Sequence, residues 1–303
     1  HISFGSECGD TGALERAAEL LEKEQFAEEL KSFLSGHPAV SYASARQTLA
    51  EKYLGSEGKL LGSPNNILAV EYLKAVKSLD TDMIPLTVGR IGAGHDTVSE
   101  DTFRSASDLR SCLYRDEDVS PYIPQSAYDI FVNEIQEGRG PVSAESLEEA
   151  VLSRLRMLGK DDLSKLRDAE DGLGNRIYDN IRKYSSAKDI VSASVSKKHT
   201  AARARRVIYN AVLSITAELT ESLPPYIRVL AANGRGTEYL SSVRETALLP
   251  VITKSADIRA ESGYCRRVFD ITSLAHDFYV LGFRGKENRA CSGDYRYTPF
   301  IGE

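Results

Sequence analysis

The chain has 303 residues, enough for two domains, and its 42% hydrophobic and 27% charged residues exclude a largely disordered protein. No apolar run approaches the roughly 20 residues of a membrane-spanning helix, so we expect no membrane association. The net charge of −6 argues against a protein that binds nucleic acid over its whole surface.

The first 118 residues alternate between strand and helix patterns. Strands are predicted over 1–6 and 84–91, and helices over 11–33, 41–54, 65–79 and 107–114. The apolar face predicted for the helix over 65–79 consists of Ile67, Leu68, Tyr72, Ala75, Val76 and Leu79. This alternation predicts an α/β layer with a parallel sheet.

A proline-rich stretch over 120–124 interrupts the alternation, and the chain then becomes mainly helical. Helices are predicted over 126–137, 143–158, 172–184, 188–195, 197–221 and 255–281, with a strand over 226–231 and a further helix after the turn at 234–236. We therefore expect two domains, residues 1–118 and residues 119–303.

The four cysteines are scattered along the chain, and none has the spacing of a metal site or a redox pair. They are Cys8, Cys112, Cys265 and Cys291. Scattered thiols are typical of a reducing compartment, so we expect a cytoplasmic protein, and we predict no metal-ligand cluster.

Two segments near the start of the chain suit a nucleotide. Gly5 closes the first strand, where bare backbone amides can approach a ligand, although a plain turn glycine is the alternative. Asn65 and Asn66 begin a helix after Ser63-Pro64. One asparagine suffices to cap the helix, which leaves a second amide for a base edge or a phosphate.

Two further segments suit phosphate. Arg90 and Ile91 end a strand before the loop Gly92-Ala93-Gly94-His95-Asp96, and an arginine there matches paired phosphate oxygens unless it is simply exposed. Ser105 and Ser107 lie at a helix start with Arg110 on the same face as Ser107, which predicts either an anion site or an ordinary serine cap.

Positive charge is concentrated in one stretch of this acidic protein. Residues 176–206 contain nine basic and two acidic residues, whereas residues 117–171 contain six basic and thirteen acidic ones. The candidates for nucleic-acid contact are Lys197, Lys198, Arg203, Arg205 and Arg206. Their concentration indicates an anionic partner, and a solvated helix face is the alternative.

The order of these motifs resembles the bacterial elongator-tRNA(Met) cytidine acetate ligase family. The resemblance rests on Phe4-Gly5-Ser6-Glu7, Ser63-Pro64-Asn65-Asn66, Arg90-Ile91-Gly92-Ala93-Gly94-His95-Asp96, Ser105-Ala106-Ser107-x-Leu109-Arg110, Lys197-Lys198-His199-Thr200-x-x-Arg203 and Leu223-Pro224-Pro225-Tyr226-Ile227-Arg228. It covers most of the chain.

The resemblance implies a partial Rossmann-like nucleotidyltransferase domain followed by a mainly α-helical tRNA-binding domain. The family adenylates acetate with ATP, for which Mg²⁺ is expected, and acetylates the wobble cytidine of elongator tRNA(Met). Gly5, one of Asn65 and Asn66, and Arg90 match its ATP-contacting positions. Ile91 and the segment with Ser105, Ser107 and Arg110 are expected on the nucleotide as well.

The chain also departs from the family pattern. Gly89 replaces the usual lysine before the arginine, and the usual tyrosine before His95-Asp96 is absent. No His-x-Gly-His element occurs in these residues. That element stabilises the charge that builds on the α-phosphate, so no catalytic residue can be assigned, and we expect an inactive fragment with an unpaired sheet edge.

Two other functions remain open at this point. One is an RNA-binding module that has lost catalysis, which predicts salt-sensitive tRNA binding without ATP binding. The other is a metabolic nucleotidyltransferase with a small phosphorylated substrate, for which the basic stretch is mere surface. The sequence does not indicate an oligomeric state.

Overall fold

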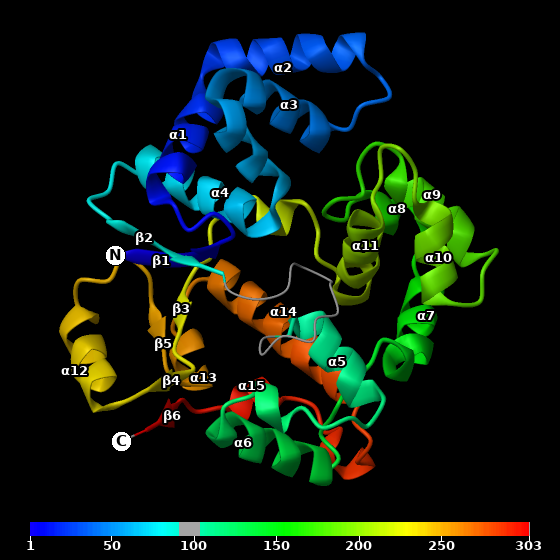
Figure 1. Cartoon of the computed structure of the whole chain (residues 1–303). Helices are drawn as coiled ribbons and strands as arrows, with labels where there is room; N and C mark the ends of the chain where they lie inside the picture. Colours follow the sequence, from blue (N-terminus) through cyan, green and yellow to red (C-terminus); the bar gives the residue numbers. More distant parts are fainter. Residues whose placement is uncertain (91–103, 303) are drawn as a thin grey trace. The chain divides into compact units, whose positions relative to one another are not determined.

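The computed structural model describes residues 1–90 and 104–302 (Figure 1). The chain divides into two compact units, His1–Tyr122, called unit 1 below, and Ile123–Glu303, called unit 2. No helix in the described part of the chain is long and apolar enough to cross a membrane.

Unit 1 is built from a parallel strand pair and the helices that connect its strands. Its elements are β1 (Ile2–Ser6), α1 (Thr11–Glu22), α2 (Glu24–Gly36), α3 (Tyr42–Leu54), a 3-10 segment (Gly55–Gly62), α4 (Pro64–Ser78), β2 (Pro85–Gly89), α5 (Ala106–Tyr114) and a 3-10 turn (Ser120–Tyr122). Strands β1 and β2 pair in parallel from Ile2 opposite Pro85 to Ser6 opposite Gly89. The structure thus confirms the predicted parallel α/β layer.

The core of unit 1 lies where α1 and α4 pack against each other and against the strand pair (Figure 1). Leu14 and Ala17 of α1 and Ala69 of α4 are completely buried there. Small side chains at such positions let helix backbones approach closely, which is why alanine recurs in this core. The core thereby fixes the start of α4 beside the end of β1.

Two predictions for unit 1 are wrong. The helix over 11–33 is two helices, because Lys23 adopts an extended conformation with φ −71° and ψ 127°. The buried face of α4 consists of Asn66, Ala69, Val70 and Leu73, whereas the predicted face residues Leu68 and Leu79 are 52% and 71% exposed. The polar Asn66 lies on the buried face, so a prediction based on the spacing of apolar residues alone selects the wrong face.

Unit 2 is mainly helical, as the sequence predicts. Its helices are α6 (Gln125–Gln136), α7 (Glu148–Arg156), α8 (Lys160–Ser164), α9 (Leu173–Ile181), α10 (Ala187–Ser194), α11 (Ala201–Leu213), α12 (Gly234–Val243), α13 (Ser255–Ile258), α14 (Gly263–Val280) and α15 (Gly293–Arg296). Short 3-10 turns cover Glu145–Leu147, Glu218–Thr220 and Lys286–Asn288. The parallel strand pairs are β3 (Ile227–Arg228) with β5 (Val251–Ile252), and β4 (Ala231–Ala232) with β6 (Phe300–Ile301).

The main core of unit 2 joins helices α7 to α11. Leu155, Leu163, Leu173, Ile177 and Val207 are completely buried within it. A smaller cluster surrounds Phe269 of α14. The helical spacing of apolar residues explains why the sequence predicts α9 and α10 close to their observed positions.

Helix ends in unit 2 differ from the predictions. The helix over 197–221 is only α11, because Thr200 caps its start and Ser214 ends it with φ 57° and ψ 38°. The helix over 255–281 divides into α13 and α14. The strand over 226–231 is replaced by the two-residue strands β3 and β4. Short capped segments of this kind carry too little periodicity to be resolved from sequence.

Candidate functional site

The carboxyl ends of β1 and β2 bring two of the predicted site residues together. Gly5 pairs with Val88, and the backbone N–H of Arg90 donates to the carbonyl oxygen of Ser6 at 2.9 Å. A Cβ atom placed on Gly5 would lie 3.9 Å from Cγ of Arg90. The side chain of Arg90 is exposed and has no hydrogen bond or ion pair to any residue that the structure describes. An exposed guanidinium at this edge of the sheet has the planar fork of donors that suits an anion.

The backbone conformation at position 5 does not require a glycine. Its φ is not positive, and an added Cβ would make only ordinary contacts at 3.9 Å. Gly9, which sequence reasoning missed, is required, because its φ of +63° lies in the left-handed region. An added Cβ there would also lie 3.4 Å from Cα of Gly89. The loop after β1 thus crosses the end of β2 at close range.

A buried hydroxyl fixes this loop to the sheet. Ser6 is completely buried, and its Oγ lies 2.7 Å from Oγ1 of Thr87 on β2. The same Oγ accepts a hydrogen bond from the backbone N–H of Gly9 at 2.9 Å. These bonds satisfy the buried serine and hold the loop in one conformation.

Asn66 of α4 also holds this loop in place through hydrogen bonds. Its side chain is 2% exposed, and its Oδ1 accepts from the backbone N–H groups of Glu7 at 2.8 Å and Cys8 at 3.1 Å. Its Nδ2 donates to the carbonyl oxygen of Leu60 at 3.2 Å. Asn66 therefore braces the loop, and a direct contact with a ligand would compete with these bonds.

Glu7 occupies the amino-terminal end of α4. Its Oε1 accepts from Nδ2 of Asn65 at 2.8 Å and from the Asn65 backbone N–H at 3.2 Å, and its Oε2 accepts from the Asn66 N–H at 2.8 Å. Burial raises the pKa of Glu7, but these hydrogen bonds outweigh it, so the net pKa lies below the usual value.

The position of Glu7 has a consequence for ligand binding. Because this carboxylate already satisfies the first amides of α4, the helix start is not an open phosphate site. Sequence reasoning quoted Glu7 within the Gly5-Ser6-Glu7 motif but gave it no role, since a carboxylate 58 positions from its partner leaves no local signal.

The segment with Ser105, Ser107 and Arg110 adopts the capping alternative. Ser105 caps α5 by accepting from the N–H of Asp108 at 3.2 Å. Asp108 is 7% exposed, and its Oδ2 lies 3.6 Å from Nη1 of Arg104. Arg110 is exposed. No hydrogen bond or ion pair within 1–90 and 104–302 joins this segment to the sheet edge, so the structure does not assemble it with Arg90.

The rest of the predicted nucleotide loop cannot be placed. Ile91, Gly92-Ala93-Gly94 and His95-Asp96 lie outside the described residues. Among the described ones, no group of three His, Cys, Asp or Glu side chains could hold a metal ion.

The basic stretch separates into paired and unpaired cations. Nε of Arg203 donates to the carbonyl oxygen of Asp168 at 2.9 Å, and its Nη atoms lie 3.1 Å from the Glu170 carboxylate and 3.4 Å from the Asp171 carboxylate. Nε of Arg206 donates to the Asp168 carboxylate at 2.7 Å. Acidic side chains of unit 2 thus neutralise part of the local charge excess.

The other predicted cations are exposed and have no acidic partner among the residues that the structure describes. Lys197 and Lys198 are exposed in the turn before α11, and neither forms an ion pair with a described residue. Arg205 is exposed, and its Nε donates only to the backbone carbonyl of Ala201 at 3.4 Å. His199, beside the two lysines, is buried at 5% exposure. These three cations remain the candidates for phosphate contact within the predicted set.

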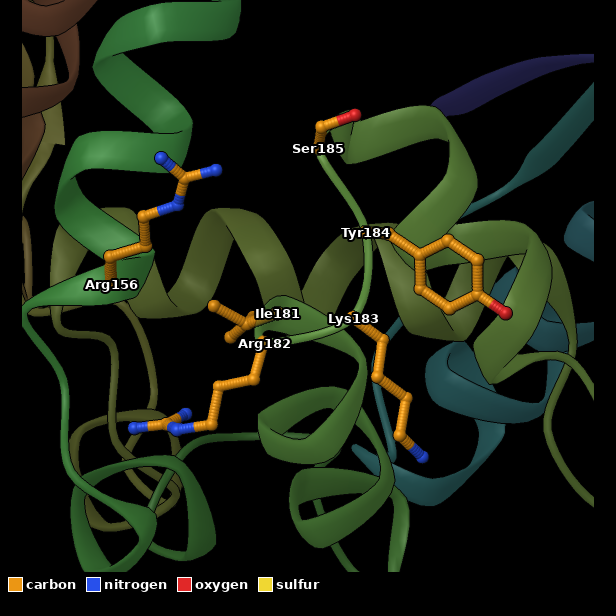
Figure 2. A pocket seen from close by; sticks show the side chains of 6 residues that line it. All are labelled: Arg156, Ile181, Arg182, Lys183, Tyr184 and Ser185. Carbon is orange, nitrogen blue, oxygen red and sulfur yellow. The ribbon is translucent and has the colours of Figure 1, made fainter.

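A second group of cations surrounds a hollow of about 470 Å³ in unit 2 (Figure 2). Its lining residues are Arg156, Ile181, Arg182, Lys183, Tyr184 and Ser185. We call it the basic hollow. Sequence reasoning counted Arg182 and Lys183 in the charge excess but missed Arg156, because that residue comes from the acidic stretch before it.

Comparison with known proteins gives one consistent relationship. A family model described as HIGH Nucleotidyl Transferase matches residues 1–293. The tRNA(Met) cytidine acetate ligase of Thermoanaerobacter sp. is 30% identical over 292 residues, covering 93% of this chain and 72% of that protein. The protein of the same name from Caldanaerobacter subterraneus subsp. tengcongensis is 31% identical over the same coverage.

A solved structure agrees with these sequences. The crystal structure of Thermotoga maritima TmcAL bound with alpha-thio ATP superimposes with a TM-score of 0.87 at 27% identity, covering 99% of this chain and 75% of that one. The apo form of the same protein gives a TM-score of 0.88 at 26% identity, with 99% and 76% coverage. The chain therefore belongs to the tRNA(Met) cytidine acetate ligase family of HIGH nucleotidyl transferases.

Proposed function

We propose that this chain carries the ATP-binding and tRNA-binding parts of a tRNA(Met) cytidine acetate ligase. The observation that carries the proposal is the exposed guanidinium of Arg90 at the joined ends of β1 and β2, which has no partner within residues 1–90 and 104–302. It is supported by relatives named for this reaction and by a structural neighbour that holds an ATP analogue.

The reaction is an adenylyl transfer followed by an acyl transfer. An acetate oxygen attacks the α-phosphorus of ATP, and pyrophosphate leaves. The exocyclic amine of the wobble cytidine then attacks the acetyl carbonyl carbon and loses a proton, and AMP leaves. The first step builds negative charge on the phosphates, so cationic groups that face them lower its barrier.

Several residues of unit 1 have proposed roles in this chemistry. The Arg90 fork contacts phosphate oxygens, while Gly5 leaves room for the nucleotide beside it. Asn65 contacts the nucleotide, and Asn66 acts through the loop that it braces. Ile91, Ser107 and Arg110 are proposed to complete the ATP site, and Ser105 is proposed to act there by capping the start of α5. Mg²⁺ would be carried largely by the phosphates of ATP, where it neutralises their charge.

Adenylyl transfer also needs a group that this sequence does not supply. The five histidines of the chain include no His-x-Gly-His arrangement. We therefore propose that the 303-residue polypeptide binds ATP but does not activate acetate by itself.

Calorimetric titration of ATP tests the nucleotide site. Arg90→Ala removes a charged donor from phosphate, and such hydrogen bonds are worth about 1.5–3 kcal/mol, so ATP affinity should fall about 10- to 100-fold. Lys31→Ala, an exposed cation on α2 without an ion pair among the described residues, is the matched control and should leave the affinity unchanged. An unchanged affinity in Arg90→Ala would overturn the assignment.

A second candidate function is an RNA-binding module without catalysis. It is favoured by the exposed cations of unit 2 that have no ion pair with a described residue, including Lys197 and Lys198. Salt-dependent tRNA binding by a chain that binds no ATP would select this alternative.

A further inference from the structure

The basic hollow lies where the end of α7 meets the segment between α9 and α10. Arg156 is the last residue of α7, Ile181 is the last residue of α9, and residues 182–185 lead to α10. Figure 2 shows Arg156 on one side of the hollow and the segment from Ile181 to Ser185 on the other. Its volume of about 470 Å³ is in the range of sites that hold small ligands or single nucleotides.

The charge of the hollow is uncompensated by its own lining. Three cations and no acidic residue line it, and none of the three forms an ion pair with a residue that the structure describes. Arg203 and Arg206 of the same unit differ, since acidic side chains pair with both. The hollow therefore retains positive charge that the rest of the basic stretch partly loses.

The backbone that carries these side chains is held in place. The carbonyl oxygen of Asn180 accepts from the N–H groups of Lys183 and Tyr184, each at 3.0 Å. The side chain of Asn180 is 7% exposed and donates to Oγ of Ser194 at 3.0 Å. Ile181 anchors the segment in the core at 3% exposure. A site on such a fixed turn loses little conformational entropy when it binds.

Arg182 is also oriented before any ligand arrives. Its guanidinium carbon lies 3.5 Å from the ring centroid of Tyr178, and its Nη1 donates to the carbonyl oxygen of the same residue at 3.1 Å. This contact fixes one face of the guanidinium, while other N–H groups remain available as donors. Tyr184, which is 40% exposed, lines the hollow on the side away from Arg156 and adds a flat aromatic surface there (Figure 2).

We propose that the basic hollow binds a backbone phosphate of RNA and that Tyr184 stacks on an adjacent unpaired base. Arginine forks and a lysine match phosphate oxygens, and an exposed tyrosine beside them matches a base that has left its helix. The inference rests on the proposed function, because the RNA is then the tRNA substrate. The basic hollow would then contact the tRNA outside the stretch over 197–206.

Filter binding of elongator tRNA(Met) to the full chain over a series of salt concentrations tests the inference. The double variant Arg156→Gln with Lys183→Gln should bind at least about 10-fold more weakly, and its slope of log K against log salt should fall by about 2, one per lost phosphate contact. Tyr184→Ala should weaken binding more than Tyr184→Phe, which keeps the stacking surface.

The control is Lys160→Gln, which removes an exposed cation of unit 2 that lies outside the hollow and has no ion pair in the described part of the chain, and it should bind as the wild type does. Equal thermal unfolding midpoints establish that the variants fold. Unchanged affinity and salt slope in the double variant would overturn the inference while leaving tRNA binding, and so the proposed function, in place.

Failure of the proposed function gives a different pattern. A wild-type chain that binds ATP but no tRNA at any salt concentration would overturn both the inference and the tRNA half of the proposal. Titration with inorganic pyrophosphate provides one more arm. If pyrophosphate binds and the double variant loses only that binding, the hollow is a small-anion site and the RNA assignment is wrong.

Discussion

Asn66 and Glu7 illustrate how individual polar residues build the end of the sheet in unit 1. Asn66 accepts two backbone N–H groups of the loop after β1, and Glu7 from that loop accepts from the first residues of α4. These hydrogen bonds hold the loop against the helix, and they join residues that are 58 or 59 positions apart in the sequence. The motif in the sequence indicates that these residues matter, but only the structure shows that they serve each other.

This arrangement predicts different costs for the two asparagines. Asn66→Ala would leave two sheltered N–H groups without an acceptor and should lower the free energy of unfolding by about 2–4 kcal/mol. Asn65→Ala removes one hydrogen bond at the half-exposed helix start and should cost about 0.5–1.5 kcal/mol. Urea unfolding measures both, and equal losses would contradict the bracing role of Asn66.

Arg90 and Arg203 show what sequence reasoning can and cannot judge at a single residue. Both were selected as candidates for phosphate contact. Arg90 lies unpaired, within the described residues, at a strand end, where its place in the motif suggests. Arg203 is 21% exposed and contacts Asp168, Glu170 and Asp171, which precede it by more than 30 positions. A count of charges along the sequence misses acidic residues that lie far from a cation in sequence but beside it in the fold.

At the scale of elements, strands and long helices were predictable and their ends were not. The strand pair of unit 1 and helices α9 to α11 follow from apolar periodicity. The break between α1 and α2 occurs at Lys23, which is neither glycine nor proline and gives no local signal. The buried face of α4 was misjudged because a buried asparagine interrupts its apolar pattern.

The true start of α11 changes the expected role of the basic stretch. Lys197 and Lys198 precede the Thr200 cap and are exposed without an ion pair to any described residue, whereas Arg203 is within the helix and paired. Lys197→Gln with Lys198→Gln should therefore weaken tRNA binding and reduce its salt slope by about 2, with unchanged stability.

The paired arginine of the same region should behave in the opposite way. Arg203→Gln removes hydrogen bonds between charged groups and should lower the free energy of unfolding by about 1–3 kcal/mol, with a smaller effect on the salt slope. Parallel salt titrations and urea unfolding of these variants compare the two effects. A salt slope that falls for Arg203→Gln but not for the lysine pair would contradict this division.

For the whole molecule, the sequence indicates an α/β part followed by a helical part, and the structure contains both. The family relationship extends through both units, because the family model matches residues 1–293. The basic hollow could not be predicted, since Arg156 joins Arg182 and Lys183 only when α7 packs beside α9. The ion pairs of Arg203 could not be predicted from the sequence for the same reason, since they form only when the chain is folded.

Acetate-dependent exchange of pyrophosphate into ATP tests the central claim most directly. It compares the 303-residue chain with a chimera that adds, in front of it, the His-x-Gly-His segment expected of this family. We expect exchange by the chimera, and none by the chain alone even though it binds ATP. Retained ATP binding by the chimera shows that it folds. A chimera that binds ATP but gives no exchange with acetate would contradict the account.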